Sequence, residues 1–356
     1  MGIFSGMLNS DESVFQDPVA LDYDYMPRII RGREEEQKKI ARAIQPLDQK
    51  RTGGNLILYG DSGIGKTVIC KHILRIVEEE ADDIIPIYIN CWKKNTSYKV
   101  VVELCEKLGY RLTHNKKTDE LFDIVQRIVN KKAAVFIFDE IDKSEDLNFL
   151  YTILEEIYRK SVILITNEIN WYSNLDQRIK SRLMTGLIEF KGYDSKELKD
   201  ILEYRKNFAF FKGVWDKKAF ENVVDKSVKI ADVRSGLYLM REAGNNAEDR
   251  GSKKIEVIDV KEAIKKLDDF NIKSIDSLEP ELKLVLKIVK EHPKAKIGEL
   301  FKKYEKKGGD KTYKTFQRSI KKLAENKFIS TEKVVGGSGG STTLVDYSKI
   351  KKLSEF

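Results

Sequence analysis

The residues with the clearest chemistry are Gly60 to Thr67, which read GDSGIGKT and fit the pattern G-x-x-x-x-G-K-[ST]. An apolar run precedes them and a helix-like stretch, Val68 to Glu80, follows. In this context glycines let backbone N–H groups close around phosphates, while Lys66 can reach the β and γ phosphates and Thr67 can ligate Mg²⁺. We therefore expect a nucleoside triphosphate to contact Gly60, Asp61, Ser62, Gly63, Ile64, Gly65, Lys66 and Thr67.

Two adjacent carboxylates, Asp139 and Glu140, follow another apolar run. At the carboxyl end of a buried strand they would lie where open α/β sheets place ligands. Asp139 would then hold magnesium through water, and Glu140 would polarise the attacking water. Asn167 ends the next apolar run, where it could orient that water, touch the γ-phosphate or simply cap a turn.

Three arginines are further candidates. Arg178 and Arg182 lie four residues apart in LDQRIKSRL and therefore share one face of a helix. Such pairs are common among surface arginines that have no specific function. Arg234 opens a later helix and would, by itself, also be a solvated residue. The residues alone assign none of the three a role.

The elements that must position these side chains are short apolar runs separated by helical patterns. Most of the runs are apolar throughout, as in strands covered on both faces, which predicts a parallel α/β sheet of about five strands. The expected strands are Asn55 to Tyr59, Ile85 to Asn90, Ala134 to Phe138, Val162 to Thr166 and Leu187 to Phe190. Expected helices between them include Tyr98 to Leu108, Asp119 to Asn130 and Asp146 to Arg159.

Beyond the sheet, the pattern changes twice. From Ser195 the strand runs stop and amphipathic helices follow, with Asp194 and Ser195 as an N-cap. Asn271 to Ser277 has no strong apolar period and is expected to be a linker. The predicted domains are a nucleotide-binding base at 1–194, a helical lid at 195–275 and a third domain at 276–356.

The third domain is predicted to contain three helices and a hairpin. The helices are expected at Glu279 to Glu291, Ile297 to Lys306 and Thr312 to Asn326. Phe328 to Val335 and Thr342 to Tyr347 would form the hairpin around a Gly-rich turn.

The net charge of +8 lies entirely in this third domain. Residues 276–356 hold 19 Lys and Arg against 11 Asp and Glu, whereas residues 1–275 hold 46 of each class. A basic terminal domain next to a neutral remainder of the chain indicates a polyanionic partner, and nucleic acid is the expected one. A cytoplasmic location is the default expectation, because the sequence has no apolar run of ~20 residues and its N-terminus lacks the pattern of a secretory signal; no membrane partner is expected. Cys70, Cys91 and Cys105 are expected to be reduced packing residues.

The order of these motifs resembles that of an AAA+ ATPase. Further stretches are similar to the archaeal replication-initiator family related to the eukaryotic origin recognition complex and its helicase-loading cell-division-cycle partner. They are Val14 to Asp17 with Leu21, Tyr25, Pro27 and Arg33 to Glu36, then Tyr88 to Cys91, Thr96 to Val100 and Leu108-Gly109. The resemblance covers nearly the whole chain and implies an AAA+ base, a helical lid and a C-terminal winged helix.

The resemblance also implies roles for single residues. Lys66, Thr67, Asp139 and Glu140 match the Walker A and B positions, Asn167 matches sensor 1, and Arg234 matches sensor 2. Arg182 matches the arginine finger best and Arg178 second; such a finger acts on a neighbour's ATP. Tyr25, Pro27 and Arg33 belong to the segment that runs past the adenine. Ala231 departs from the family, which usually has Gly in this Gly-Asp-x-Arg pattern.

A winged helix would supply the DNA contact. Phe316, Ile320 and Leu323 form a core-facing stripe of the third helix, and a basic stripe lies opposite. The helix would enter the major groove and the hairpin would reach the minor groove or phosphates. The alternative is a Lys-rich face that is only exposed to solvent and binds no DNA. The DNA-binding candidates are Lys311, Thr312, Lys314, Thr315, Arg318 and Lys322, with Gly336, Gly337, Ser338, Gly339 and Gly340 in the wing. Lys93 to Asn95 and Arg111 to Lys117 are candidates for a second contact, at the place where family members insert a DNA-touching element.

The resemblance implies an ATP-regulated initiator that binds duplex origin DNA, associates with the nucleoid and helps recruit or load the replicative helicase (MCM). Its expected ligands are ATP or ADP with Mg²⁺, and its expected partner on DNA is a paralogous initiator or a second copy. Because family members often hydrolyse ATP slowly and retain ADP, a switch is expected rather than a fast enzyme. Two alternatives stay open: a DNA-dependent AAA+ motor or remodeller, and a DNA-binding transcription regulator with a structural ATP.

Overall fold

A computed structural model describes residues 13–230, 232–276, 278–325, 328–335 and 341–347. The chain divides into two compact units, Met1–Val260 and Lys261–Phe356, and each is described by itself. Ala231 and the predicted wing residues Gly336 to Gly340 lie outside the described residues. None of the described helices is long and apolar enough to span a membrane.

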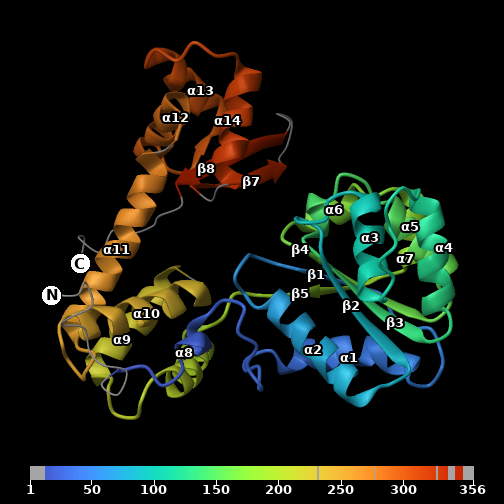
Figure 1. The fold of residues 1–356 in the computed structure, drawn as a ribbon. Helices are drawn as coiled ribbons and strands as arrows, with labels where there is room; N and C mark the ends of the chain where they lie inside the picture. Colours follow the sequence, from blue (N-terminus) through green and yellow to red (C-terminus); the bar gives the residue numbers. More distant parts are fainter. Residues whose placement is uncertain (1–12, 231, 277, 326–327, 336–340, 348–356) are drawn as a thin grey trace. The chain divides into compact units, whose positions relative to one another are not determined.

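A five-stranded parallel sheet forms the base of the first unit, with strand order β2-β3-β4-β1-β5 (Figure 1). This confirms the predicted parallel α/β sheet. The crossover order places β4 between β1 and β3, and because these strands are parallel their carboxyl ends lie at one edge of the sheet. The strands are β1 Leu56–Tyr59, β2 Ile84–Asn90, β3 Ala133–Asp139, β4 Lys160–Thr166 and β5 Gly186–Glu189.

Helices cover both faces of this sheet, which is why its strands are apolar throughout (Figure 1). On β3, Val135 and Ile137 belong to the core shared with α1 and α2, while Phe136 and Phe138 belong to the core shared with α3, α4, α5 and α7. The helices of the base are α1 Glu34–Ile44, α2 Lys66–Glu80, α3 Ser97–Lys107, α4 Thr118–Val129, α5 Asn148–Glu156, α6 Ile169–Ser173 and α7 Gln177–Leu183. Short 3-10 helices are η2 Pro18–Leu21, η3 Gln45–Leu47 and η4 Ile141–Lys143.

A helical lid follows the base, as the sequence predicts. Its first helix begins with a capping box, because Asp194 accepts a hydrogen bond from the backbone N of Glu197 and the Glu197 carboxylate accepts one from the backbone N of Asp194. The lid helices are α8 Ser195–Ala209, α9 Lys217–Ile230, α10 Val233–Asp249 and α11 Val257–Asp276. The linker expected at Asn271 to Ser277 is therefore helical as far as Asp276, and that prediction was wrong. The segment lacks an apolar period, but it also lacks a Gly or Pro that would end a helix.

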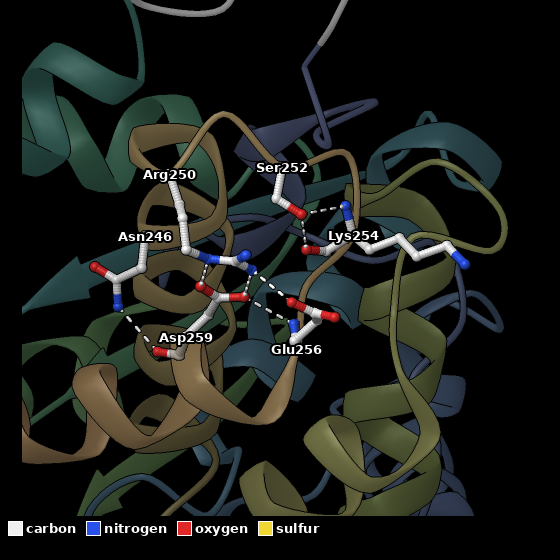
Figure 2. A network of polar contacts seen from close by, with 6 residues as sticks. All are labelled: Asn246, Arg250, Ser252, Lys254, Glu256 and Asp259. Carbon is white, nitrogen blue, oxygen red and sulfur yellow. Dashed lines mark hydrogen bonds and ion pairs between the residues drawn. The ribbon is translucent and has the colours of Figure 1, made fainter.

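Asp259 fixes the point at which α11 begins (Figure 2). Its carboxylate is 2% exposed and accepts two hydrogen bonds from Arg250, at 3.1 and 2.9 Å, and one from the backbone N of Glu256 at 2.7 Å. Asn246 on α10 donates to the Asp259 carbonyl at 2.9 Å. Hydrogen-bond donors therefore stabilise the buried carboxylate of Asp259. The same contacts connect the end of α10, through Asn246 and Arg250, to the start of α11.

The N-terminal segment, residues 13–33, lies along the lid before it reaches the base. The backbone N–H groups of Gln16 and Asp17 donate to the Ala209 carbonyl at 2.9 and 3.2 Å. The ring of Phe15 stacks on Phe210 with centroids 4.9 Å apart. We call this segment the strap, because it joins the lid to the start of α1.

Gly244 in α10 leaves the space that the Phe15 ring occupies, because a Cβ there would overlap that ring. Replacing Gly244 with valine is expected to expel the ring and to destabilise the lid by about 1–3 kcal/mol, as overpacked cores do. Thermal unfolding measures the loss, and faster trypsin cleavage after Arg28 or Arg31 reports the loosened strap. Gly192→Val is the control, since a Cβ at Gly192 meets nothing within 4 Å. Equal midpoints and cleavage rates for the two variants would refute this role of Gly244.

The second unit contains the helices and hairpin expected of a winged helix. Its core joins the three helices to the hairpin, with Phe316, Ile320 and Leu323 of α14 all buried, as predicted. A three-stranded sheet has the order β6-β8-β7, with antiparallel pairing. The elements are α12 Pro280–Glu291, β6 Ala295–Lys296, α13 Ile297–Lys306, α14 Tyr313–Glu325, β7 Ile329–Val335 and β8 Ser341–Tyr347.

Candidate functional site

A cavity of about 320 Å³ lies at the carboxyl edge of the sheet, between the base, the strap and the lid. Of the predicted loop residues, Ser62, Gly63, Gly65, Lys66 and Thr67 line it. Asp139, Glu140, Asn167 and Arg234 line it too, as do Tyr25 and Pro27 of the strap. The structure therefore brings together candidates that span more than 200 residues of sequence.

The phosphate loop has the backbone that the glycines were expected to permit. Gly63 and Gly65 have φ of 84° and 95°, in the left-handed region that favours glycine. A Cβ at Gly63 would lie 2.6 Å from Asp232 Oδ1, so glycine also allows the lid to approach closely. Helix α2 begins at Lys66, within the last part of the loop sequence, and its N-terminus favours a bound anion.

Lys66 is 6% exposed and already holds the loop together. Its ammonium donates to the carbonyls of Gly60 and Asp61, at 2.7 Å each, and to Asn167 Oδ1 at 2.9 Å. Asn167 follows β4, so the lysine links the loop to the neighbouring strand end. The ammonium is thus fixed on the cavity wall where phosphates would lie.

Thr67 and Asp139 form the candidate magnesium site. Thr67 Oγ1 donates to Asp139 Oδ2 at 2.6 Å, although the two residues are 72 apart in sequence. A hydroxyl and a carboxylate are oxygen ligands of the kind that Mg²⁺ prefers, directly or through water. These residues therefore fit a hydrated magnesium ion bound to phosphates.

Glu140 occupies a strained backbone conformation at the end of β3, with φ 54° and ψ 43°. Glu140 lines the cavity, as does Asp139 next to it in the sequence. Burial, and then the Asp139 charge, raise the pKa of Glu140 above its usual value. A carboxylate with a raised pKa is a better general base than an ordinary one.

Arg234 lies in the first turn of α10, where the sequence places it. Its Nη2 donates to Ser62 Oγ at 3.0 Å, which joins the lid to the phosphate loop. Asp232 caps the helix by accepting from the backbone N of Arg234 at 2.9 Å, and it also pairs with the guanidinium at 3.2 Å. The guanidinium therefore stands at the phosphate end of the cavity.

Arg178 and Arg182 lie on α7 and do not line this cavity. Arg178 pairs with Asp176 at 2.9 Å and its side chain is 76% exposed. Arg182 forms an ion pair with Glu155, and its guanidinium lies 4.7 Å above the Tyr151 ring. Neither arginine can therefore act on the nucleotide of its own chain in this conformation.

Arg33 does not line the cavity, in contrast to the expectation that it contacts the nucleotide. It is 4% exposed, lies 4.1 Å from the Tyr193 ring centroid, and donates to the carbonyls of Ile64, at 3.3 Å, and Lys191. The guanidinium therefore binds the phosphate loop at Ile64 and the segment between β5 and α8 at Lys191. Gly60, Asp61 and Ile64 likewise support the loop without lining the cavity.

Several cavity residues were missed by the sequence reasoning. Tyr23 and Ile29 of the strap are 55% and 59% exposed, and such exposed apolar groups on a cavity wall suit a nucleobase. Arg205 is 7% exposed; it donates to the Asp22 carbonyl at 3.0 Å and lies 4.6 Å above the Tyr25 ring. Burial lowers the pKa of Arg205. The spacing of Ile201, Tyr204 and Arg205 on one face of α8 was the available signal.

The predicted DNA-binding residues lie on α14 and at its start. Lys311, Thr312, Lys314, Arg318 and Lys322 are exposed, opposite the buried stripe. Thr312 also caps the helix, since its Oγ1 accepts from the backbone N of Thr315 at 3.4 Å. Lys322 pairs with Glu279 at 2.9 Å, so its charge is partly compensated. Gln317 and Lys321, which the sequence reasoning did not name, share this exposed face.

Comparisons with known proteins agree with this architecture. Residues 49–170 match the family model of an AAA domain, and residues 199–265 match that of a Cdc6 AAA+ ATPase-type lid domain. The ORC1-type DNA replication protein 1 of Archaeoglobus fulgidus is 30% identical over 330 residues, which cover 86% of this chain and 80% of that protein.

Solved structures agree over nearly the whole chain. The ORC1 protein of Aeropyrum pernix, in complex with DNA, is 26% identical with a TM-score of 0.69 and covers 96% of this chain and 95% of its own. The ORC2 protein of the same organism, in its ADPNP-ADP complexes, has a TM-score of 0.72 at 18% identity and covers 94% of both chains, which supports the fold. The chain therefore belongs to the family of ORC1-type DNA replication proteins, which have an AAA+ domain and a Cdc6-type lid.

Proposed function

We propose that the protein is a DNA replication initiator that binds duplex origin DNA and changes state with its bound nucleotide. The observation that carries the proposal is the likeness to ORC1-type DNA replication proteins over most of the chain, which includes a DNA-bound ORC1 structure. The exposed basic face of α14 and the positive charge of residues 276–356 support it.

The nucleotide would act as a switch through groups that bridge the base and the lid. ATP would place its phosphates at Lys66 and its base against the strap. Glu140 would then hold the attacking water and accept its proton, with Asn167 beside it. A bound Mg²⁺, held by Thr67 and Asp139, would neutralise charge that develops on the phosphates. Arg234 of the lid contacts Ser62 of the phosphate loop. Loss of the γ-phosphate would therefore change the contacts that set the position of the lid relative to the base.

Arg182 fits a role in a second subunit's site. It lies at the surface, outside the cavity of its own chain, and would have to leave Glu155 to reach another nucleotide. A self-associated or paralogous pair on DNA is therefore part of the proposal, with Arg178 as the second candidate. Recruitment of the replicative helicase would be the output of this assembly.

Origin preference is tested by footprinting. With Mg·ATP present, the protein should protect a segment of its own replication origin at concentrations at which a shuffled duplex of equal length is unprotected. Equal protection of both duplexes would contradict origin binding. Directional strand displacement, or ATPase activity strongly stimulated by any DNA, would favour a motor.

The basic face of α14 should account for part of the salt dependence of DNA binding. Replacing Lys314 and Arg318 together with alanine is expected to weaken duplex binding about 10-fold near 0.1 M salt. Because two phosphate contacts are lost, the slope of log K against log salt should also fall by about two. Fluorescence anisotropy over a salt series measures both quantities.

The matched control removes the same charge elsewhere on the second unit. Lys287 on α12 and Lys302 on α13 are exposed and lie outside α14. Replacing both with alanine should leave the slope close to that of the unmodified protein. If both double variants change binding equally, only net charge matters and α14 is not the contact.

A further inference from the structure

Tyr88 contributes a hydroxyl group to the Walker B carboxylate. Its OH donates to Asp139 Oδ2 at 2.8 Å, and the same oxygen accepts from Thr67 Oγ1 at 2.6 Å. The other oxygen, Oδ1, accepts from the backbone N of Glu140 at 2.9 Å. The Asp139 side chain, 3% exposed, is therefore held by three donors from three elements: β2, α2 and the turn after β3.

The sheet register explains how a residue on β2 reaches this carboxylate. Asn90 is the strand partner of Asp139, and Tyr88 precedes Asn90 by two residues on β2. Side chains two residues apart point to the same face of a sheet, so Tyr88 lies on the face toward which Asp139 points. A phenol ring is long enough to span this diagonal, whereas a shorter polar side chain at position 88 would not reach.

The ring of Tyr88 is fixed from both sides. It packs against the core between the sheet and α2. The ammonium of Lys71, one helical turn after Thr67 on α2, lies 5.0 Å from the ring centroid and lines the nucleotide cavity. Phenylalanine would keep this packing, so the hydroxyl can be tested separately from the ring.

We infer that Tyr88 is a positioning residue for the magnesium that accompanies the nucleotide, because its hydroxyl holds the Asp139 carboxylate against Thr67. The terminal torsion of an aspartate is broad, so a carboxylate with fewer donors has more orientations available. The hydrogen bond from Tyr88 restricts the Asp139 carboxylate to one orientation before magnesium binds. The entropy cost of ordering this carboxylate is then not part of the free energy of magnesium binding. The inference rests on the nucleotide site of the proposed function and is independent of what DNA the protein binds.

The test is Tyr88→Phe, with magnesium and nucleotide binding as the readouts. A fluorescent N-methylanthraniloyl ATP is titrated with MgCl₂, and its affinity is measured separately in EDTA. In the variant, half-saturation with magnesium is expected at about 3- to 10-fold higher concentration, the equivalent of losing one hydrogen bond of ordinary net strength. Affinity in EDTA should stay within about 2-fold, because the phosphate contacts of Lys66 and the loop are unchanged.

Tyr98→Phe is the matched control, since Tyr98 lies on α3 with 44% exposure. It should show neither effect. An unchanged magnesium midpoint in Tyr88→Phe overturns the inference, and so does an equal loss of affinity with and without magnesium, which would mean that the hydroxyl only supports the loop.

A second variant tests the same contact from its other side. Asp139→Asn should raise the magnesium midpoint by itself, and adding Tyr88→Phe to it should raise the midpoint no further; a fully additive effect contradicts the inference. If the unmodified protein binds no nucleotide, the proposed function fails instead. Loss of origin preference alone leaves the inference on Tyr88 intact.

Discussion

Replacing Lys66 with alanine is expected to weaken ATP binding about 100-fold, the equivalent of roughly 3 kcal/mol for truncating a buried charged partner. The ammonium already points into the cavity, where three acceptors fix it without a nucleotide. Its orientation is therefore determined before the phosphates arrive, and little ordering is needed on binding. Equilibrium titration with a fluorescent ATP analogue measures the loss.

This substitution also affects the empty protein, and the control must separate the two effects. Alanine would remove a donor from the Gly60 and Asp61 carbonyls and from Asn167, so the loop should become less ordered. Thermal unfolding without nucleotide measures this contribution. Lys39→Ala, an exposed position on α1, should change neither quantity. ATP affinity within 3-fold of the unmodified protein would show that phosphates do not bind at Lys66.

Those parts of the site that depend on local pattern could be predicted from the sequence. The phosphate loop needs glycines, a lysine and a threonine in consecutive positions, and its neighbouring strand and helix are equally local. Asp139 and Asn167 were predicted because apolar runs end there, and parallel strands bring their carboxyl ends to one edge. Arg234 could be placed at the start of a helix, but its role at the site came only from the resemblance to AAA+ ATPases.

Residues whose role depends on distant contacts could not be predicted in the same way. Arg33 lies in the expected segment, yet its guanidinium contacts Ile64 and Lys191, the second of which is 158 residues away. Arg205 on α8 reaches back to Asp22 across 183 residues. The local sequence shows at most that Arg205 shares a helix face with Ile201 and Tyr204. It does not show that either arginine is buried, because burial depends on the tertiary fold.

The switch itself is best tested by Glu140→Gln, which is expected to lower the rate of ATP hydrolysis about 10³-fold while changing ATP affinity less than 3-fold. General base catalysis contributes about 10² to 10⁴ in rate, and glutamine keeps the shape of the side chain without its basicity. The strained turn at Glu140 should tolerate the change because the backbone demands are the same for both side chains. Single-turnover measurements of phosphate release give the rate.

The same variant separates a switch from a structural nucleotide. If hydrolysis ends the DNA-bound state, complexes formed by Glu140→Gln with ATP should last longer than those of the unmodified protein, by a factor that follows the ratio of the hydrolysis rates until simple dissociation limits the lifetime. Glu168→Gln is the control, because Glu168 lies at the same sheet edge but does not line the cavity. Equal DNA lifetimes for all three proteins would mean that the nucleotide only stabilises the fold, as in a transcription regulator with a structural ATP. A longer lifetime in Glu140→Gln alone would show that ATP hydrolysis at Glu140 controls how long the protein stays bound to DNA.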